Sequence, residues 1–118
     1  MNTRSSILAL SQSEKIKAGL IWTSQTVEIS MGLPENSKQG CDQLISALLG
    51  MVANEIHLGM KVAPHNGWEA ALKHINTATV MINSNVAQDA PYHLSKALSQ
   101  VTGIGQEAMN ALNQEGLV

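Results

Sequence analysis

Aromatic residues are almost missing from this sequence, which contains no Phe, two Trp and one Tyr. A hydrophobic core must therefore be built from Leu, Ile, Val, Met and Ala. Ala, Leu and Met are strong helix formers, and small aliphatic side chains let helices approach one another closely. The composition thus favours an all-α protein, and the length of 118 residues suits a single domain spanning residues 1–118.

Cysteine is also scarce, because Cys41 is the only one. A single thiol excludes an internal disulfide, and the absence of a Cys-x-x-Cys pair excludes a zinc ribbon and a dithiol redox site. These features are typical of a reducing compartment, so we expect a cytoplasmic protein. Cys41 falls on the centre of the apolar face of its predicted helix, where we expect a buried structural thiol.

Charged residues make up only 14% of the chain, and 7 basic and 9 acidic residues leave a net charge of -2. The charges are scattered, which argues against nucleic acid or an anionic membrane as a partner. No window reaches the roughly 18 apolar residues that a membrane helix needs. The N-terminal stretch ILAL is too short for the core of a signal peptide. We therefore expect a soluble protein whose weakly charged surface does little to prevent self-association.

Three prolines divide the chain into four segments, and each segment shows the apolar periodicity of a helix. Pro34, Pro64 and Pro91 stand where a helix can begin or end, not within an apolar period. In the second segment the apolar residues at three- and four-residue steps include Leu44, Ile45, Leu48, Val52 and Ile56. Short connections place consecutive long helices antiparallel. The sequence therefore predicts an up-down-up-down antiparallel four-helix bundle.

Two local signals concern helix ends and helix contacts. Asn66 and Glu69 have the spacing of a capping box, so we expect the third helix to start at Asn66. Gly59, Gly103 and Gly105 lie within predicted helices, where each costs about 1 kcal/mol relative to Ala. Close approach of neighbouring helices, or a frayed helix near Gly103, would account for them.

The first predicted helix has a second apolar stripe. Leu20 and Val27 belong to its core face, whereas Ala18, Trp22 and Ile29 fall on the opposite side at about 100° per residue. A helix that is apolar on two faces is either sandwiched within the fold or used for association. The alternative is a single exposed Trp lying over its own bundle. We favour a homodimer formed through this helix, because exposed Trp and Ile make good interface anchors.

The stretch MVANEIHLGM, residues 51–60, contains two ionisable residues in apolar surroundings. Glu55 lies about 60° from the centre of the apolar face and therefore points inward or along a helix seam, whereas His57 points outward. Glu55 is either a seam carboxylate that reaches water or a buried group that pairs with another helix. The candidate partners on other helices are His74, Asn85, His93, Lys17 and Glu28.

Residue spacing gives no support for a metal site or for catalysis. Glu55 and His57 are two residues apart, about 200° around the helix, so they cannot bind one ion. The Glu-x-x-His pairs that diiron bundles use do not occur. No nucleophile motif, phosphate-binding loop or dinucleotide fingerprint is present either. We therefore predict no metal site, no cofactor and no catalytic residue.

Asn83 and Asn85 are unusual in a predicted helix, because Asn is a weak helix former. They fall about 80° to either side of the apolar centre, on the two seams of the third helix. Such seam amides can set helix register by hydrogen bonding to neighbouring helices, which is the interpretation we favour. Alternatively, Asn83 and Asn85 line a polar pocket with Glu55 and His74 that binds a small ligand.

The spacing of His93, Lys96 and Ala97 resembles the His-x-x-Lys-Gly/Ala element of histidine phosphotransfer domains, which are helical bundles of about this size. The resemblance implies that His93 accepts a phosphoryl group and that Lys96 offsets its charge. In that family the His is exposed in mid-helix, whereas His93 follows Pro91 in the first turn of a helix. Leu98 also stands where the family has a small residue. Otherwise His93 is a surface residue near a helix start.

These observations favour a non-enzymatic, self-associating interaction module that can also offer a surface to another protein. Its support is the second apolar stripe together with the absence of a catalytic constellation. A bundle that binds a small ligand or a metal through inward polar residues around Glu55 is the alternative, and a phosphotransfer protein using His93 is the weaker one.

Overall fold

The computed structural model describes residues 1–118, which form four α-helices and no strand. The helices are α1 (Thr3–Met31), α2 (Glu35–Val62), α3 (Asn66–Asn83) and α4 (Ala90–Gln114), and a one-turn 3-10 helix, η1 (Ala87–Asp89), precedes α4. The helices pack against one another as an all-α four-helix bundle, which confirms the predicted fold class.

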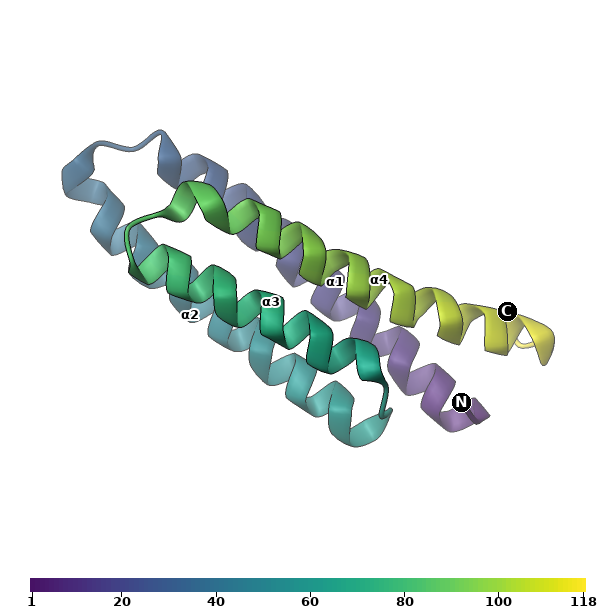
Figure 1. Ribbon diagram of the computed structural model, residues 1–118. Coiled ribbons are helices and arrows are strands. Elements are labelled where there is room, and N and C mark those ends of the chain that lie inside the picture. The colour runs from purple at the N-terminus through teal and green to yellow at the C-terminus, as the bar shows by residue number, and fades with distance from the viewer.

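Consecutive helices run antiparallel, and α4 returns to pack against α1, so the four helices form a closed ring (Figure 1). Both termini and the α2–α3 connection lie at one end of the elongated molecule (Figure 1). We call the opposite end, which carries the α1–α2 and α3–α4 connections, the distal end. At the end with the termini, the Thr3 hydroxyl donates a hydrogen bond to the Glu115 carboxylate and ties α1 to α4.

The core is aliphatic except for one aromatic side chain, Trp68, which is fully buried at the start of α3. Its indole Nε1 donates a hydrogen bond of 2.9 Å to the Ala63 carbonyl, so the ring is fixed to the α2–α3 connection. Gly59 leaves room for this ring, because a Cβ there would lie 2.9 Å from Trp68 Cε2. The expected close approach at Gly59 is therefore present.

Close approach also explains Gly105, but it does not explain Gly103. A Cβ at Gly105 would overlap the side chain of Ser13, whose hydroxyl donates a 2.8 Å hydrogen bond to the Val101 carbonyl. Gly105 thus lets α4 lie directly against α1. Nothing lies within 4 Å of a Cβ built at Gly103, which is exposed.

Helix α3 starts at Asn66, as predicted, but Asn66 is not its capping residue. The N-cap is His65, not Asn66, and its Nδ1 accepts a 2.8 Å hydrogen bond from the Gly67 amide. Its Nε2 lies 2.5 Å from Glu107 Oε2 on α4. Because Nδ1 accepts a hydrogen bond, the ring hydrogen is on Nε2, and Nε2–H donates a hydrogen bond to the Glu107 carboxylate. His65 therefore links the α2–α3 connection to α4.

The end of α3 also differs from the sequence prediction, which placed Asn85 within the helix. The helix ends at Asn83, and Asn85 has a left-handed backbone with φ of 65°. The Val86 amide donates to the Met81 carbonyl at 3.0 Å, and the Asn85 amide donates to the Ile82 carbonyl at 3.3 Å. This pair of bonds defines a Schellman motif, in which Asn85 occupies the left-handed position that glycine usually takes.

The two helices joined at the α2–α3 connection differ in length, with 28 residues in α2 and 18 in α3. At a rise of 1.5 Å per residue, α2 extends about 15 Å beyond the end of α3 toward the distal end. Accordingly, no residue of α2 before Ile45 is buried. Cys41, predicted to be buried, lies in this extension and is only partly covered.

The seat of Trp68 leads to a prediction about α2. Gly59→Ala should lower the free energy of unfolding by about 1–3 kcal/mol, because the new methyl group overlaps a buried ring that cannot move freely. Gly50→Ala is the matched control in the same helix, since Gly50 is exposed and nothing lies within 4 Å of its Cβ position. This control should raise the stability by about 0.4–1 kcal/mol. Urea unfolding followed by circular dichroism measures both, and equal effects of the two substitutions would contradict this account of Trp68.

Candidate functional site

Helix α1 buries both apolar and polar side chains on its inner face and also exposes large apolar ones on its outer face. Its buried polar residues are Ser6, Gln12, Ser13, Thr23 and Ser30. Its exposed large apolar residues are Ile7, Ile21, Trp22, Ile29 and Met31. Two of the inward hydroxyls are satisfied within the helix, where Thr23 donates to the Gly19 carbonyl and Ser30 to the Val27 carbonyl, both at 2.7 Å. The outer face of α1 therefore carries apolar surface that its own bundle does not cover.

Beside this face, an open groove of about 380 Å³ runs between α1 and α2. We call it the α1–α2 groove; its lining residues are Lys15, Ile16, Gly19, Trp22, Thr23, Leu48, Met51, Val52 and Glu55. Gly19 lets the helices meet at its floor, since a Cβ there would lie 3.2 Å from Val52 Cγ2. Trp22 is 68% exposed and stands at the edge of the groove.

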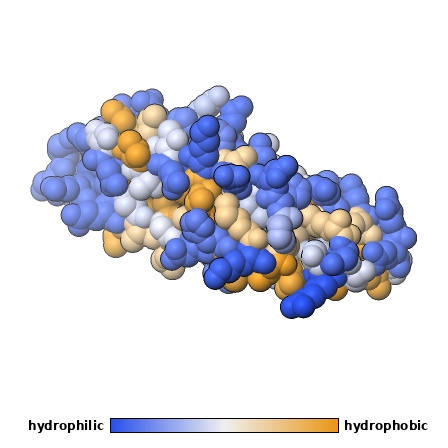
Figure 2. Space-filling model, turned by 60° about the horizontal axis from the view of Figure 1, so that its bottom comes forward, coloured by the Kyte–Doolittle hydropathy of each residue, from blue (hydrophilic) through white to orange (hydrophobic).

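The groove is part of a longer apolar surface, which we call the apolar stripe: Trp22 and Ile29 on α1, and Leu44, Leu48 and Met51 on α2. All but the half-buried Leu48 are exposed. Residues three, four or seven apart lie on one side of a helix, so each helix contributes a continuous row. Patches of apolar side chains also interrupt the polar surface in Figure 2.

The apolar pattern of the sequence predicted the α1 part of this stripe but not the α2 part. Trp22 and Ile29 are exposed as expected, and Ala18 is half-buried. Leu44 was placed on the core face, yet it is 67% exposed. The missed signal is a series of adjacent apolar pairs in α2: Leu44–Ile45, Leu48–Leu49 and Met51–Val52. Neighbours in a helix point about 100° apart, so when Ile45, Leu49 and Val52 face the core, their partners face outward.

Glu55 closes one end of the α1–α2 groove as a seam carboxylate. Lys15 Nζ lies 3.0 Å from Glu55 Oε2, and Gln12 Nε2 donates to the same oxygen at 3.2 Å and to the Glu55 carbonyl at 2.9 Å. The hydrogen bond from Lys15, followed by the one from Gln12, holds the pKa of Glu55 below its ordinary value of 4.5. The partner is therefore on α1, as one alternative expected, but it is Lys15 in place of Lys17.

The four residues of the hypothetical ligand pocket do not come together. Glu55 lies between α1 and α2, whereas the His74 ring lies 6.2 Å from the His93 ring between α3 and α4. Asn83 accepts a 2.8 Å hydrogen bond from Ser46 across α2 and α3, which is the register-setting contact we favoured. Asn83 and Asn85 do share a cavity, but it lies at the distal end and is lined by α2 residues in place of Glu55 and His74.

His93 lies in the first turn of α4 and is half-buried. Its ring is stacked near His74, and the edge of the Tyr92 ring lies 5.2 Å away between centroids. The Nδ1 atom is buried and has no hydrogen-bond partner. Lys96 Nζ lies over the Tyr92 ring, 5.3 Å from its centroid. This setting differs from the exposed mid-helix histidine of phosphotransfer domains, so a phosphoacceptor role for His93 stays a prediction from the sequence resemblance alone.

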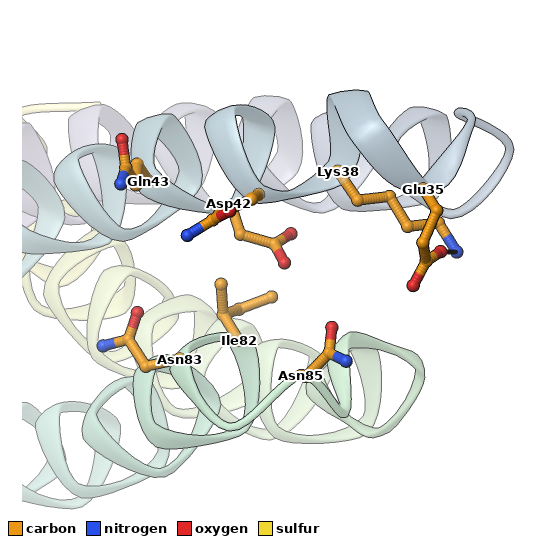
Figure 3. Close-up of a pocket in the computed structure, with 8 residues that line it drawn as sticks. Glu35, Lys38, Asp42, Gln43, Ile82, Asn83 and Asn85 are labelled. Atoms are coloured by element: carbon orange, nitrogen blue, oxygen red, sulfur yellow. Dashed lines mark ion pairs between the residues drawn. The ribbon is translucent and has the colours of Figure 1, made fainter.

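The cavity that contains Asn83 and Asn85 has a volume of about 480 Å³. We call it the distal cleft; its lining residues are Glu35, Lys38, Gln39, Asp42, Gln43, Ile82, Asn83 and Asn85. It lies between the extension of α2 and the end of α3 (Figure 3). The molecule therefore has two candidate sites of opposite character, an apolar groove along α1 and α2 and a polar cleft at the distal end.

Comparison with known proteins does not favour either of these two candidate sites. No family model matches the chain, and neither a curated protein nor a solved structure matches it. None of the four helices combines the length and the apolar character needed to cross a membrane. Any functional assignment must therefore be argued from the surfaces and cavities of the bundle.

The Lys15–Glu55 pair leads to a prediction about pH. A carboxylate whose pKa is lowered by folding stabilises the protein above its unfolded pKa, and this stabilisation is lost as the pH falls through the folded pKa. A double-mutant cycle with Lys15→Gln and Glu55→Gln should therefore give a coupling energy of about 0.2–1 kcal/mol at pH 7. The coupling should disappear once the pH is well below 4.5, the ordinary pKa of Glu55. Urea unfolding at several pH values measures it, and a coupling energy that persists at low pH would rule out the ion pair as its source.

Proposed function

We propose that this chain is a non-enzymatic interaction module that forms a homodimer through the apolar stripe. The observation that carries the proposal is the second apolar face of α1, which leaves Trp22 and Ile29 exposed although Leu20 and Val27 already face the core. In a monomer these apolar side chains stay in contact with water and do not contribute the free energy that their burial would supply. Each large apolar side chain gains about 1.5–3 kcal/mol when it is fully buried, so a partner that covers the stripe recovers several such contributions.

The shape of the molecule suits such an interface. The bundle measures 54 × 21 × 18 Å, so one long side offers roughly the 800 Å² per partner that stable complexes bury. The α1–α2 groove supplies a recess of about 380 Å³ next to a protruding Trp22. In a two-fold dimer, the Trp22 ring of each copy can enter the groove of the other copy, because the same surface holds both the projection and the recess.

The charges around the groove also favour a second copy as the occupant. Lys15 and Glu55 are the two charged residues in its lining, and they pair with each other at 3.0 Å. A partner can therefore cover the groove without burying an unpaired charge, which would be costly. The net charge of only -2 produces little repulsion between copies. A weakly charged, self-complementary surface of this kind supports self-association; nucleic acid binding needs a basic surface that is missing here.

We further propose that the module works in the cytoplasm, where its one free thiol, Cys41, would stay reduced. The remaining long sides of the bundle would then be available to a different protein partner. The small-ligand alternative keeps support only at the distal cleft, which does not involve the apolar stripe.

Removal of Trp22 tests the proposed interface. Trp22→Ala should raise the dimer dissociation constant about 30-fold or more, because a central aromatic anchor contributes about 2 kcal/mol or more. Tyr92→Ala is the matched control, since Tyr92 is 63% exposed and lies on α4 outside the stripe. Sedimentation equilibrium over a range of protein concentrations gives both constants. A wild-type protein that stays monomeric, or equal weakening by both substitutions, would reject the interface.

A second test leaves both tryptophans in place. Trp68 is fully buried and Trp22 is exposed, so only Trp22 changes its environment when the dimer forms. We expect the fluorescence maximum of the wild-type protein to shift to shorter wavelength as the protein concentration rises. Met51→Glu places a charge beside the groove, and because burying that charge is unfavourable, it should abolish the shift. An unchanged shift in Met51→Glu would show that association uses another surface.

A further inference from the structure

The distal cleft exists because α2 continues past the end of α3. Along this extension α2 presents Glu35, Lys38 and Asp42 to the space, and no residue before Ile45 is buried. Ile82 is the one hydrophobic lining residue. In Figure 3 Ile82 of α3 and Asn85, just after α3, point toward α2, and Asp42 points back toward them. Ile82 is only 1% exposed, so it closes the base of the cleft, and the accessible walls are polar side chains from both sides.

The cleft reaches across the end of the bundle. A second cavity of about 50 Å³ adjoins it, and Lys38, Asp42 and Asn85 line both. On the far side, this second cavity is bounded by Ser30 and Met31 of α1 and by Ala87 and Gln88 of η1. Asp42 and Asn85 thus stand where the two spaces meet, within reach of a molecule that occupies either one.

Asn85 is not required by the fold at its position. The same Schellman motif ends α4, where Leu117 and Gly116 donate to the Leu112 and Asn113 carbonyls and glycine takes the left-handed residue with φ of 73°. Glycine adopts this conformation without steric cost, whereas Asn tolerates it less well. The Asn85 side chain is exposed, lines the cleft, and takes part in none of the side-chain hydrogen bonds of the bundle. Its amide is therefore free to bind another molecule.

The charges in the cleft select for a cation. Lys38 Nζ lies 3.6 Å from Glu35 Oε2, so these two charges offset each other. Asp42 has no ion-pair partner, which leaves one unpaired negative charge on the wall. The amino end of α2 and the carboxyl end of α3 both border the cleft, so their partial positive and partial negative charges offset each other and the unpaired Asp42 carboxylate sets the sign. An anion would meet repulsion here, and a neutral molecule would leave the carboxylate without a charged partner.

We propose that the distal cleft binds a small primary amine in its ammonium form. The ammonium group donates hydrogen bonds to the Asp42 carboxylate and to the Asn85 amide oxygen, and the carbon chain of the ligand lies along the cleft between the two walls. Such charge-assisted hydrogen bonds are stronger than neutral ones. The site is independent of the apolar stripe, so it goes beyond the proposed dimer and does not require it.

Three probes with the same four-carbon skeleton and a terminal hydroxyl test the charge requirement: 4-amino-1-butanol, 1,4-butanediol and 4-hydroxybutanoate. Each is titrated into the isotope-labelled full-length protein, and amide chemical shifts are followed by NMR at constant pH and ionic strength. We expect saturable shifts for residues of the cleft with the amine, and at least about tenfold weaker binding of the diol and the anion. Equal binding of all three probes, or no saturable shift with the amine, would overturn the proposal.

Two variants and one control assign the contacts. Asp42→Asn keeps the shape of the side chain but removes its charge, and it should weaken amine binding about tenfold. Asn85→Gly removes the amide and favours the left-handed backbone, so it should weaken binding while leaving the thermal midpoint unchanged or raised. Asn54→Ala, an exposed α2 position outside every cavity described above, should change nothing. Undiminished amine binding by Asp42→Asn or Asn85→Gly would contradict the assigned contacts.

Discussion

The seat of Trp68 is the contact on which the rest of the bundle depends. Its ring packs against Gly59, and its Nε1 donates a hydrogen bond to the Ala63 carbonyl, so one side chain of α3 is held against the last turn of α2. The start of α3 is thereby set relative to α2. Because α3 has 18 residues and α2 has 28, α2 then continues past the end of α3 and forms one wall of the distal cleft.

Much of this architecture could be predicted from the sequence, because helix formation depends on local patterns. The prolines mark the connections, and the apolar periodicity predicts four helices in one antiparallel bundle. Trp22 and Ile29 were also recognised as outward-facing, since their direction follows from the geometry of a single helix. Glu55 was placed on a seam for the same reason.

The parts that could not be predicted depend on how the helices meet. Periodicity shows that α2 has an apolar side, but it does not show which residue of each adjacent apolar pair faces the core, and so Leu44 was assigned to the core together with Ile45. The partner of Glu55 depends on the relative displacement of α1 and α2, which brings Lys15 to the carboxylate in place of Lys17. Asn85 was assigned to the helix because a Schellman motif with Asn in the left-handed position lacks the usual glycine signal.

Because the helices form a closed ring, the packing of the bundle does not require any particular helix to come first in the chain. Each helix packs against two others, and the α1–α4 pair is as much part of the ring as any pair joined by a connection. The Thr3–Glu115 contact already brings the two chain ends together. A circular permutant that links the ends and opens the chain at the α1–α2 connection would keep every helix pair of the bundle. The order in which the helices are synthesised is therefore separable from the order in which they pack.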